Sequence, residues 1–388
     1  MKKKTIPVFF AFLCMGFGDA VGPFVGLAKE TFNLSQTMAQ LIPFAGFIMF
    51  GVLSIPMGIF QDKIGKKNTL SIGLFIALIA MLIPLVFTLG SYTTFLVTIL
   101  LLGSGAAVLQ VSGNPIMRDV SPEGKYSSNL SFAQFVKAIG SLTGPIIPVL
   151  AVSLWASDWQ LIFPIYAFAL AITLVLVRIM NIEEKVNEAA SATIKSSVQL
   201  LKNKYVLSMV LGIFLYVGAE VCLSSGIPLY MQDQYDIDIS SLGILGSGLF
   251  FLALTIGRFF GGLLLKSIQP VKFLVWTSIL SLAGILLFIS GIQIVSLVAI
   301  FIVGLGFANI FPLIFSIAVD KMPERSNELS GLMVTAIIGG AILPFIMGAM
   351  ADMVGTVFGF VVPLIAIAYI YLLSTNEKKK LADKRSVK

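Results

Sequence analysis

The sequence predicts an all-α membrane protein with twelve transmembrane helices in two pseudo-symmetric six-helix bundles. Three observations support this fold class. Of the 388 residues, 57% are hydrophobic and only 12% are charged, whereas a soluble protein carries about 25% charge. Apolar runs of about 20 residues, the length that crosses a bilayer core, recur twelve times. The one long hydrophilic connection follows the sixth run, which divides the chain into two halves.

The predicted spans follow a short basic N-terminus and are joined mostly by short connections, so neighbouring helices are expected to run antiparallel. The runs cover residues 6–28, 38–60, 68–88, 94–117, 129–153, 159–180, 205–230, 240–265, 273–291, 293–318, 329–350 and 355–374. The predicted domains are an N-terminal bundle at 1–180, a cytoplasmic linker at 181–204, a C-terminal bundle at 205–374 and a basic cytoplasmic tail at 375–388. Because no small-residue cleavage site follows Lys2 to Lys4, we expect the first run to remain as a helix.

Composition also limits the chemistry. The chain has no histidine, which excludes a Ser-His-Asp triad, a histidine metal site and a histidine proton relay. Its two cysteines, Cys14 and Cys222, lie in apolar runs and predict neither a disulfide framework nor a zinc site. The sequence offers no nucleophile–base pair. We therefore expect no enzyme activity, no cofactor and no metal.

The charges predict the orientation in the membrane. Nearly all of the 26 lysines and arginines fall in the termini, at inner helix ends, or in loops that face the cytoplasm when both termini do. This bias follows the positive-inside rule. The net charge of +7 therefore reports orientation, and nucleic-acid binding is not expected. We expect a multi-pass monomer, surrounded by lipid, in a bacterial cytoplasmic membrane.

The two halves carry similar residues at equivalent places. Asp19 in the first run corresponds to Glu220 in the seventh, and Asn114 in the fourth corresponds to Asn309 in the tenth. Several such matches in register favour a duplicated unit. A duplicated architecture predicts a substrate site near the middle of the membrane, at the interface of the halves.

Three charged side chains lie well inside the predicted spans, where each costs about 2.5–3.5 kcal/mol on insertion scales, and a fourth lies closer to the inner end of its span. They are Asp19, Lys137, Glu220 and Arg258. Asp19 and Glu220 are the predicted carriers of a coupling proton, because a carboxylate in a poorly solvated place readily exchanges one. The alternative for Asp19 is a permanent ion pair with Lys137. Arg258 is a buried charge near the inner end of its span, with its head group able to reach the interface.

Polar side chains recur at helical spacing on several spans. On the fifth run one face carries Ser127, Ser131, Gln134, Lys137 and Ser141. Amides and hydroxyls with few charges suit a polyhydroxylated ligand. The predicted substrate-binding residues are Gln110, Asn114, Gln134, Lys137, Tyr216 and Asn309. The alternative for each amide is a hydrogen bond between helices. For Lys137, the two roles of binding a substrate carboxylate and of neutralising Asp19 both stay open.

The loop after the second run carries a motif. It reads Gly58-Ile-Phe-Gln-Asp62-Lys-Ile-Gly65-Lys66-Lys67 and resembles the signature of the major facilitator superfamily in composition and spacing. The resemblance implies that the glycines allow close helix packing. It also implies that the aspartate sits against a helix N-terminus of the other half, where the helix dipole favours an anion. We therefore expect Gly58, Asp62, Gly65, Lys66 and Lys67 to form a gating latch. A solvated basic loop explains the lysines but not the Gly and Asp spacing.

Further motifs narrow the resemblance. The chain is similar to the fucose–galactose–glucose:proton symporter group in six segments: Ala133-Gln134, Asn114-Pro115, Tyr216-Val-Gly-Ala-Glu220, Gly257-Arg258-Phe-Phe-Gly-Gly262, Gly339-Gly340-Ala-Ile-Leu-Pro344 and Val362-Pro363-Leu364. This resemblance implies import of a sugar by alternating access, driven by a proton, with sodium as the alternative coupling ion.

The chain departs from that group at the expected site. Fucose-type members carry a carboxylate in helix four where this chain has Gln110, and an asparagine where it has Lys137. Their helix-one aspartate falls about one turn after Asp19. A symporter for an anionic sugar derivative, such as a sialic or uronic acid, is therefore one alternative. A drug or metabolite exporter and a membrane sensor are the others.

Overall fold

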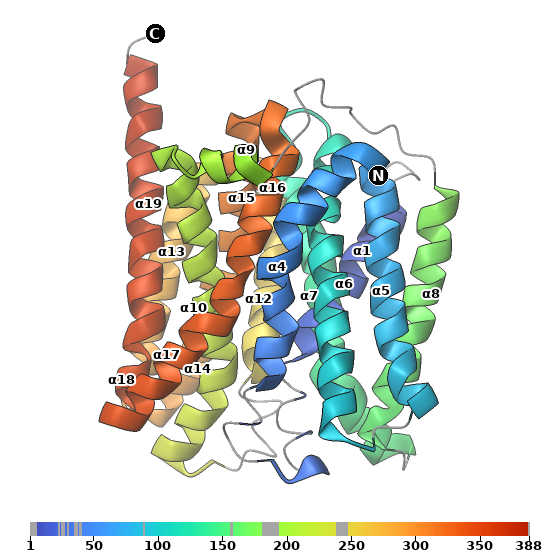
Figure 1. The fold of residues 1–388 in the computed structure, drawn as a ribbon. Coiled ribbons are helices and arrows are strands. Elements are labelled where there is room, and N and C mark those ends of the chain that lie inside the picture. Colours follow the sequence, from blue (N-terminus) through green and yellow to red (C-terminus); the bar gives the residue numbers. More distant parts are fainter. Residues whose placement is uncertain are drawn as a thin grey trace. The chain divides into compact units, whose positions relative to one another are not determined.

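The computed structural model describes residues 6–21, 24, 28, 31–34, 38, 41–87, 90–155, 158–180, 194–237 and 247–386. In these residues ten helices are long and apolar enough to cross a membrane, and Ile6–Asp19 and Leu249–Leu264 are shorter apolar helices. Each of these helices overlaps one of the twelve predicted runs, which confirms the predicted fold class (Figure 1). Residues 2–4, and residues 181–193 of the predicted linker, lie outside the described residues.

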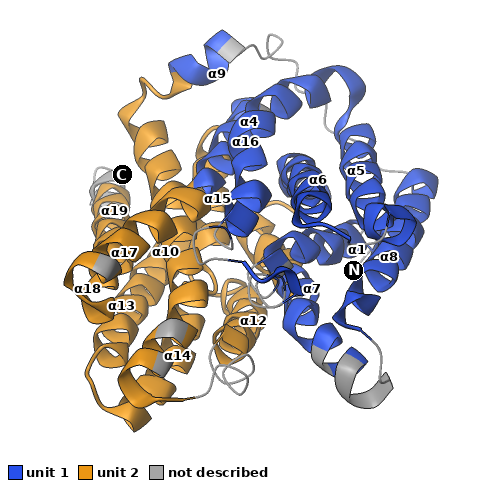
Figure 2. Ribbon diagram, turned by 60° about the horizontal axis from the view of Figure 1, so that its bottom comes forward, with its two compact units in different colours: residues 1–121, 136–199, 323–338 blue, residues 122–135, 200–322, 339–388 orange. Residues whose placement is uncertain are grey.

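The helices group into two compact units, which Figure 2 shows in two colours. Unit 1 comprises Met1–Ser121, Val136–Gln199 and Pro323–Ile338, and unit 2 comprises Pro122–Phe135, Leu200–Met322 and Gly339–Lys388. The elements of unit 1 are α1 (Ile6–Met15), η2 (Gly16–Ala20), α4 (Leu41–Ile64), α5 (Lys66–Phe87), α6 (Tyr92–Asp119), the later part of α7 (Tyr126–Trp155), η3 (Trp159–Leu161), α8 (Ile162–Ile179), most of α9 (Ile194–Leu200), η5 (Pro323–Arg325), α16 (Ser326–Thr335) and η6 (Ala336–Ile338).

Unit 2 holds most of the second half of the chain together with the start of α7. Its further elements are α10 (Lys204–Tyr235), α12 (Leu249–Leu264), α13 (Pro270–Phe288), α14 (Gln293–Phe307), α15 (Ile310–Lys321), α17 (Gly339–Val354), α18 (Thr356–Gly359) and α19 (Val361–Ser386). The predicted basic tail continues the last helix as far as Ser386.

Two membrane spans are divided between the units: α7, and the span formed by α16, η6 and α17. The first residues of α7 pack within unit 2, where Ser128 Oγ donates to the Gly262 carbonyl at 2.6 Å and the Ser127 and Ser316 hydroxyls lie 2.8 Å apart. In the same way α16 packs within unit 1 beside α4, where a Cβ on Gly331 would lie 3.2 Å from the Ser54 carbonyl oxygen. The predicted bundles at 1–180 and 205–374 follow chain order and stay a prediction, since packing groups these two segments differently.

Glycines let the first helix of each half touch a partner backbone. In unit 1 a Cβ on Gly16 would collide with the Lys137 carbonyl oxygen, and one on Gly140 would collide with that of Leu13. In unit 2 a Cβ on Gly339 would collide with the Phe214 carbonyl oxygen in the same manner. Only glycine permits such close approach. The contact in unit 1 brings the segment that carries Asp19 against the middle of α7.

Proline releases the carbonyl four residues before it, because it has no N–H to donate. In two helices a serine from another helix takes the released carbonyl. The pairs are the Val111 carbonyl, released by Pro115, with Ser330 Oγ at 3.0 Å, and the Ser224 carbonyl, released by Pro228, with Ser247 Oγ at 2.6 Å. Each of these hydrogen bonds ties two helices of one unit together.

The tenth span is broken where the sequence predicted one continuous run. α14 ends at Phe307 and α15 begins at Ile310, with a turn at Ala308 and Asn309 between them. Pro312 removes the N–H that would bond the Ala308 carbonyl in a continuous helix. The Ala308 carbonyl accepts instead from Arg258 Nε at 3.1 Å. The break therefore presents a backbone acceptor to a buried cation.

The motif between α4 and α5 makes a tight turn with a buried ion pair. Gly65 has a φ of +87°, and its N–H bonds the Gln61 carbonyl at 2.8 Å, which ends α4. Lys66 Nζ lies 2.5 Å from Asp119 Oδ2 at the end of α6, with both side chains buried. Lys67 Nζ donates to the Met180 carbonyl at 2.6 Å. No sequence pattern distinguishes Asp119, because a carboxylate is common at the inner end of a membrane helix.

The ion pair between Lys66 and Asp119 gives a stability prediction. Lys66→Met should lower the free energy of unfolding by about 3 kcal/mol, because it removes the ammonium that pairs with a buried carboxylate. The double variant Lys66→Met with Asp119→Leu should recover most of this loss. The measurement is thermal unfolding of the purified protein in detergent, with the exposed Lys202→Met as the matched control. A double variant no more stable than Lys66→Met alone would contradict the prediction.

Candidate functional site

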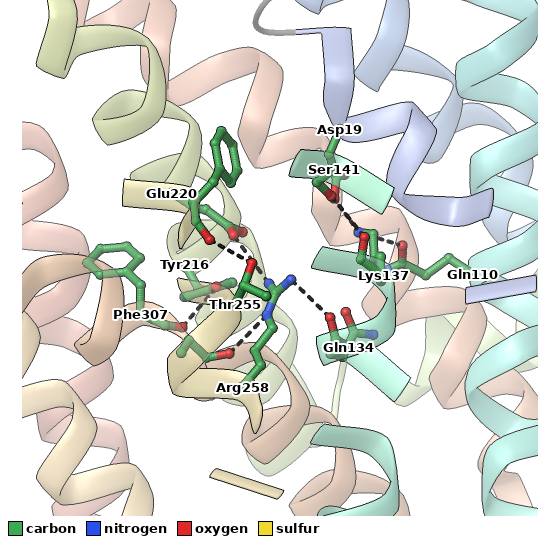
Figure 3. Close-up of polar contacts among 12 residues, drawn as sticks. Asp19, Gln110, Gln134, Lys137, Ser141, Tyr216, Glu220, Thr255, Arg258 and Phe307 are labelled. Carbon is green, nitrogen blue, oxygen red and sulfur yellow. Dashed lines mark hydrogen bonds and ion pairs between the residues drawn. The ribbon is translucent and has the colours of Figure 1, made fainter. Parts of the chain in front are cut away.

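The first cluster of polar side chains surrounds Asp19 in unit 1 (Figure 3). Lys137 Nζ lies 3.1 Å from Asp19 Oδ2, so the ion pair that the sequence left as an alternative does form. The same ammonium lies 3.4 Å from Gln110 Oε1 on α6. Ser141 Oγ donates to Asp19 Oδ2 at 2.9 Å. Side chains of η2, α6 and α7 thus meet at the Asp19–Lys137 pair.

Local sequence explains how these groups meet. Asp19 lies in the 3-10 turn η2, which continues α1 beyond the glycine contact with α7. Lys137 and Ser141 are four residues apart on α7 and therefore face the same side of the helix. The polar stripe predicted on this helix is divided, because Ser127, Ser131 and Gln134 belong to unit 2.

An aromatic pair lies beside the first cluster. The ring of Phe17 stacks on Tyr166 of α8, with ring centroids 3.8 Å apart and an interplanar angle of 8°. The Tyr166 and Thr143 hydroxyls lie 2.8 Å apart. Sequence analysis missed both residues of this pair, since one tyrosine in an aromatic-rich span carries no distinguishing signal. Stacked rings restrict the segment that carries Asp19 from a second side.

The second cluster lies in unit 2 and centres on Arg258 of α12 (Figure 3). Its Nη2 lies 3.4 Å from Glu220 Oε1 on α10. Besides the Ala308 carbonyl, the guanidinium contacts the backbone carbonyl of Gln134 on α7, with Nη1 3.4 Å away. The side chain is 5% exposed. Arg258 is therefore held inside the unit, and its head group does not extend to the interface as the sequence allowed.

The predicted substrate-binding residues divide by what their side chains contact. Gln110 and Lys137 lie together beside Asp19, whereas Asn114 is fully buried further along α6. Tyr216 is fully buried, and its hydroxyl donates to the Phe307 carbonyl at 3.0 Å.

Two further amides belong to the second cluster. Asn309 is buried, and its Nδ2 donates to the Gly257 carbonyl at 2.7 Å. Gln134 is also buried, and among the described residues its Nε2 has no hydrogen-bond partner. Tyr216 therefore bonds the backbone next to the helix break, and Asn309, which lies within the break, bonds the backbone of α12. Spacing in the sequence indicates neither contact.

The two clusters share one electrostatic plan. Each pairs a carboxylate on the first helix of its half with a cation on another helix, and each pair is neutral. The carboxylates are the more exposed members, at 26% for Asp19 and 18% for Glu220 against 11% for Lys137 and 5% for Arg258. A buried charge is tolerated when it is paired. Partial exposure also lets a proton or a solute reach the carboxylate.

Comparison with known proteins finds similar sugar transporters. The chain is 27% identical over 354 residues to the glucose/galactose transporter of Brucella abortus, which covers 88% of this chain and 86% of the relative. It is 23% identical over 379 residues to the L-fucose-proton symporter of Escherichia coli, covering 89% and 86%. A solved structure of the E. coli fucose:proton symporter superposes with a TM-score of 0.79 at 22% identity, covering 96% of this chain and 99% of the other.

The sequence profile described as Major Facilitator Superfamily matches residues 8–337 and, in a second match, 209–388. The two matches together span nearly the whole chain, and the fold, the loop motif and the paired halves agree with them. The chain belongs to the major facilitator superfamily.

Proposed function

We propose that this protein imports a sugar or sugar-like solute together with a proton by alternating access. The observation that carries the proposal is the pair of neutral carboxylate–cation clusters, each with a partly exposed carboxylate on the first helix of its half. Relatives named as a glucose/galactose transporter and as an L-fucose-proton symporter support the solute class and the coupling ion. The chain is a membrane transporter and not an enzyme.

Asp19 and Glu220 are the proposed proton carriers. A carboxylate that takes a proton no longer balances its cation, so loading changes the electrostatics of the cluster. The partner cation and the Ser141 hydroxyl hold Asp19 in place while it is ionised. A symporter needs such a link between proton and solute. If the carrier could complete its cycle with only one of them bound, the proton gradient would not drive accumulation of the solute.

The solute contacts are proposed for Gln110, Gln134 and Lys137. Gln110 and Lys137 lie beside the proton carrier, and Gln134 has a buried amide nitrogen with no partner among the described residues. Sugar hydroxyls both donate and accept, which suits amides. For Asn114, Tyr216 and Asn309 we propose a supporting role. Tyr216 bonds the Phe307 carbonyl at the end of α14, and Asn309, in the turn between α14 and α15, bonds the Gly257 carbonyl of α12.

The loop motif is the proposed gate, with Gly58, Asp62, Gly65, Lys66 and Lys67 as its members. Gly65 forms the turn, and Lys66 and Lys67 are bound to the ends of α6 and α8 respectively. Asp62 is exposed at the end of α4, and α4 packs beside α16 within unit 1. This packing supports a latch between the motif and the start of α16.

The distribution of positive charge supports a bacterial cytoplasmic membrane with both termini inside, and we propose a monomer as the working unit. The direct test is reconstitution in liposomes, with uptake of labelled D-glucose, D-galactose, L-fucose and D-glucuronate measured with and without an inward proton gradient. Gradient-driven accumulation of at least one sugar supports the proposal. Equal uptake with and without the gradient for every sugar would contradict it.

Amide substitutions test the proton carriers. Asp19→Asn or Glu220→Gln should abolish accumulation against a gradient, so that the internal concentration stops at the external one. Counterflow exchange should continue, because exchange needs only reorientation of the loaded carrier. The exposed Glu123→Gln serves as the matched control. If both variants still concentrate solute, the coupling carboxylate is elsewhere.

Substitution in the motif tests the gate. Asp62→Asn should slow net transport about tenfold, which corresponds to about 1.4 kcal/mol in the barrier, with little change in solute affinity. The reason is that the motif stands at the end of α4, away from the Asp19 cluster of the same unit. Initial uptake rates and equilibrium binding, measured on the same preparation, separate the two effects. Unaltered turnover in a well-folded variant rules the latch out.

A further inference from the structure

The Lys137 ammonium lies where a solute can reach it. It carries three N–H donors, and two acceptors among the described residues lie within reach, Asp19 Oδ2 at 3.1 Å and Gln110 Oε1 at 3.4 Å. The longer of these contacts is near the limit of a hydrogen bond. The side chain keeps 11% exposure and that of Asp19 keeps 26%. A carboxylate that approaches from the exposed side therefore meets an ammonium whose donors are not all strongly engaged.

The charge around Asp19 depends on this one cation. Among the described residues of α1 and α8, the titratable groups on the side of Asp19 are Tyr166, bonded to Thr143, and Cys14, bonded to Thr173, and both are uncharged at neutral pH. The charged residue of α8, Arg178, lies in the last turn of that helix. On α6 the charged residues, Arg118 and Asp119, stand about two turns beyond Gln110. The pair of Asp19 and Lys137 thus sets the net charge of the cluster, which is zero.

Neutral and anionic solutes change this balance differently. If Asp19 takes a proton while a neutral sugar binds, the cluster is left with the uncompensated charge of Lys137. If the solute brings one carboxylate, Lys137 faces two carboxylates, and one proton on Asp19 restores neutrality. A half-buried site favours the neutral combination, because an unpaired charge there loses solvation without gaining a partner.

We propose that the solute is a monosaccharide bearing one carboxylate, and that its carboxylate replaces Asp19 as the partner of Lys137. This inference rests on the proposed function of proton-coupled sugar import. The proton arrives on Asp19 from water, the solute anion pairs with Lys137, and no covalent bond changes. Proton and solute bind together because each removes the charge that the other would leave unbalanced. Release of the anion inside returns Asp19 to Lys137 and expels the proton.

The experiment measures binding and proton uptake on the full-length protein in detergent. D-glucuronate and D-glucose are titrated by calorimetry between pH 6 and pH 8, and proton uptake is followed with an indicator in weakly buffered solution. For the wild type, D-glucuronate should take up close to one proton per molecule bound. Its dissociation constant should rise about tenfold per pH unit where that uptake is complete, by linkage. D-Glucose should bind more weakly, without proton uptake.

Two variants separate the roles of the pair. Asp19→Asn keeps an acceptor for Ser141 but releases Lys137, so it should bind D-glucuronate more tightly than the wild type, with no pH dependence and no proton uptake. Lys137→Gln should weaken D-glucuronate binding at least tenfold, and Lys137→Arg should restore part of it. The exposed Lys202→Gln is the matched control and should bind both sugars as the wild type does.

The outcomes distinguish this inference from the proposed function. The inference is overturned if D-glucuronate binds without proton uptake, or if Asp19→Asn weakens its binding. It is also overturned if D-glucose shows the proton uptake and D-glucuronate does not bind, in which case proton-coupled sugar import still stands. Failure of every sugar to respond to a proton gradient in liposomes contradicts the proposed function itself. The wild-type measurement decides the point even if a variant does not fold.

Discussion

Hydrogen bonding of the backbone inside the membrane is the constraint on which this structure depends. Lipid offers no partner for a free carbonyl, so a donor within the protein stabilises a carbonyl that a proline releases. Ser330, Ser247 and Arg258 supply such donors to Val111, Ser224 and Ala308. Proline in a spanning helix therefore does more than bend it. It creates an acceptor, and the acceptor fixes which helix packs against it and at what height.

The pairing of buried charges is the second constraint. In the second cluster one side chain, Arg258, satisfies both constraints. Arg258 neutralises Glu220, but it also donates to a carbonyl released by Pro312 and to the backbone of α7. Lys137 contacts fewer groups, namely one carboxylate and one amide oxygen. The two halves thus share a carboxylate on their first helix but differ in the cation. The second pair is bound into the backbone, whereas the first is held mainly by side chains and is better placed to change partners.

Much of the fold follows from sequence, because span length and hydropathy are properties of short segments. The twelve runs and the superfamily signature from Gly58 to Lys67 required no knowledge of packing. The candidate site followed only in part. The sequence identified Asp19, Lys137 and Glu220 because they are charged residues inside predicted spans. It left open whether Lys137 pairs with Asp19. Neither the pairing of Lys66 with Asp119 nor the binding of Tyr216 to the backbone at a helix break has a local signal. Both depend on contacts between helices far apart in the chain.

The bond from Ser330 to the Val111 carbonyl has a consequence for how this protein can change over evolution. The two bonded groups belong to residues 219 positions apart. A backbone carbonyl cannot be altered by mutation, so selection acts on the donor and on Pro115, which leaves that carbonyl without its own helical partner. A lineage that loses Pro115 regains an N–H for Val111, and the hydroxyl at position 330 becomes dispensable. We therefore expect Pro115 and Ser330 to co-vary, although they do not bond each other. Each acts on the Val111 carbonyl, one by leaving it without a helical donor and the other by supplying a donor.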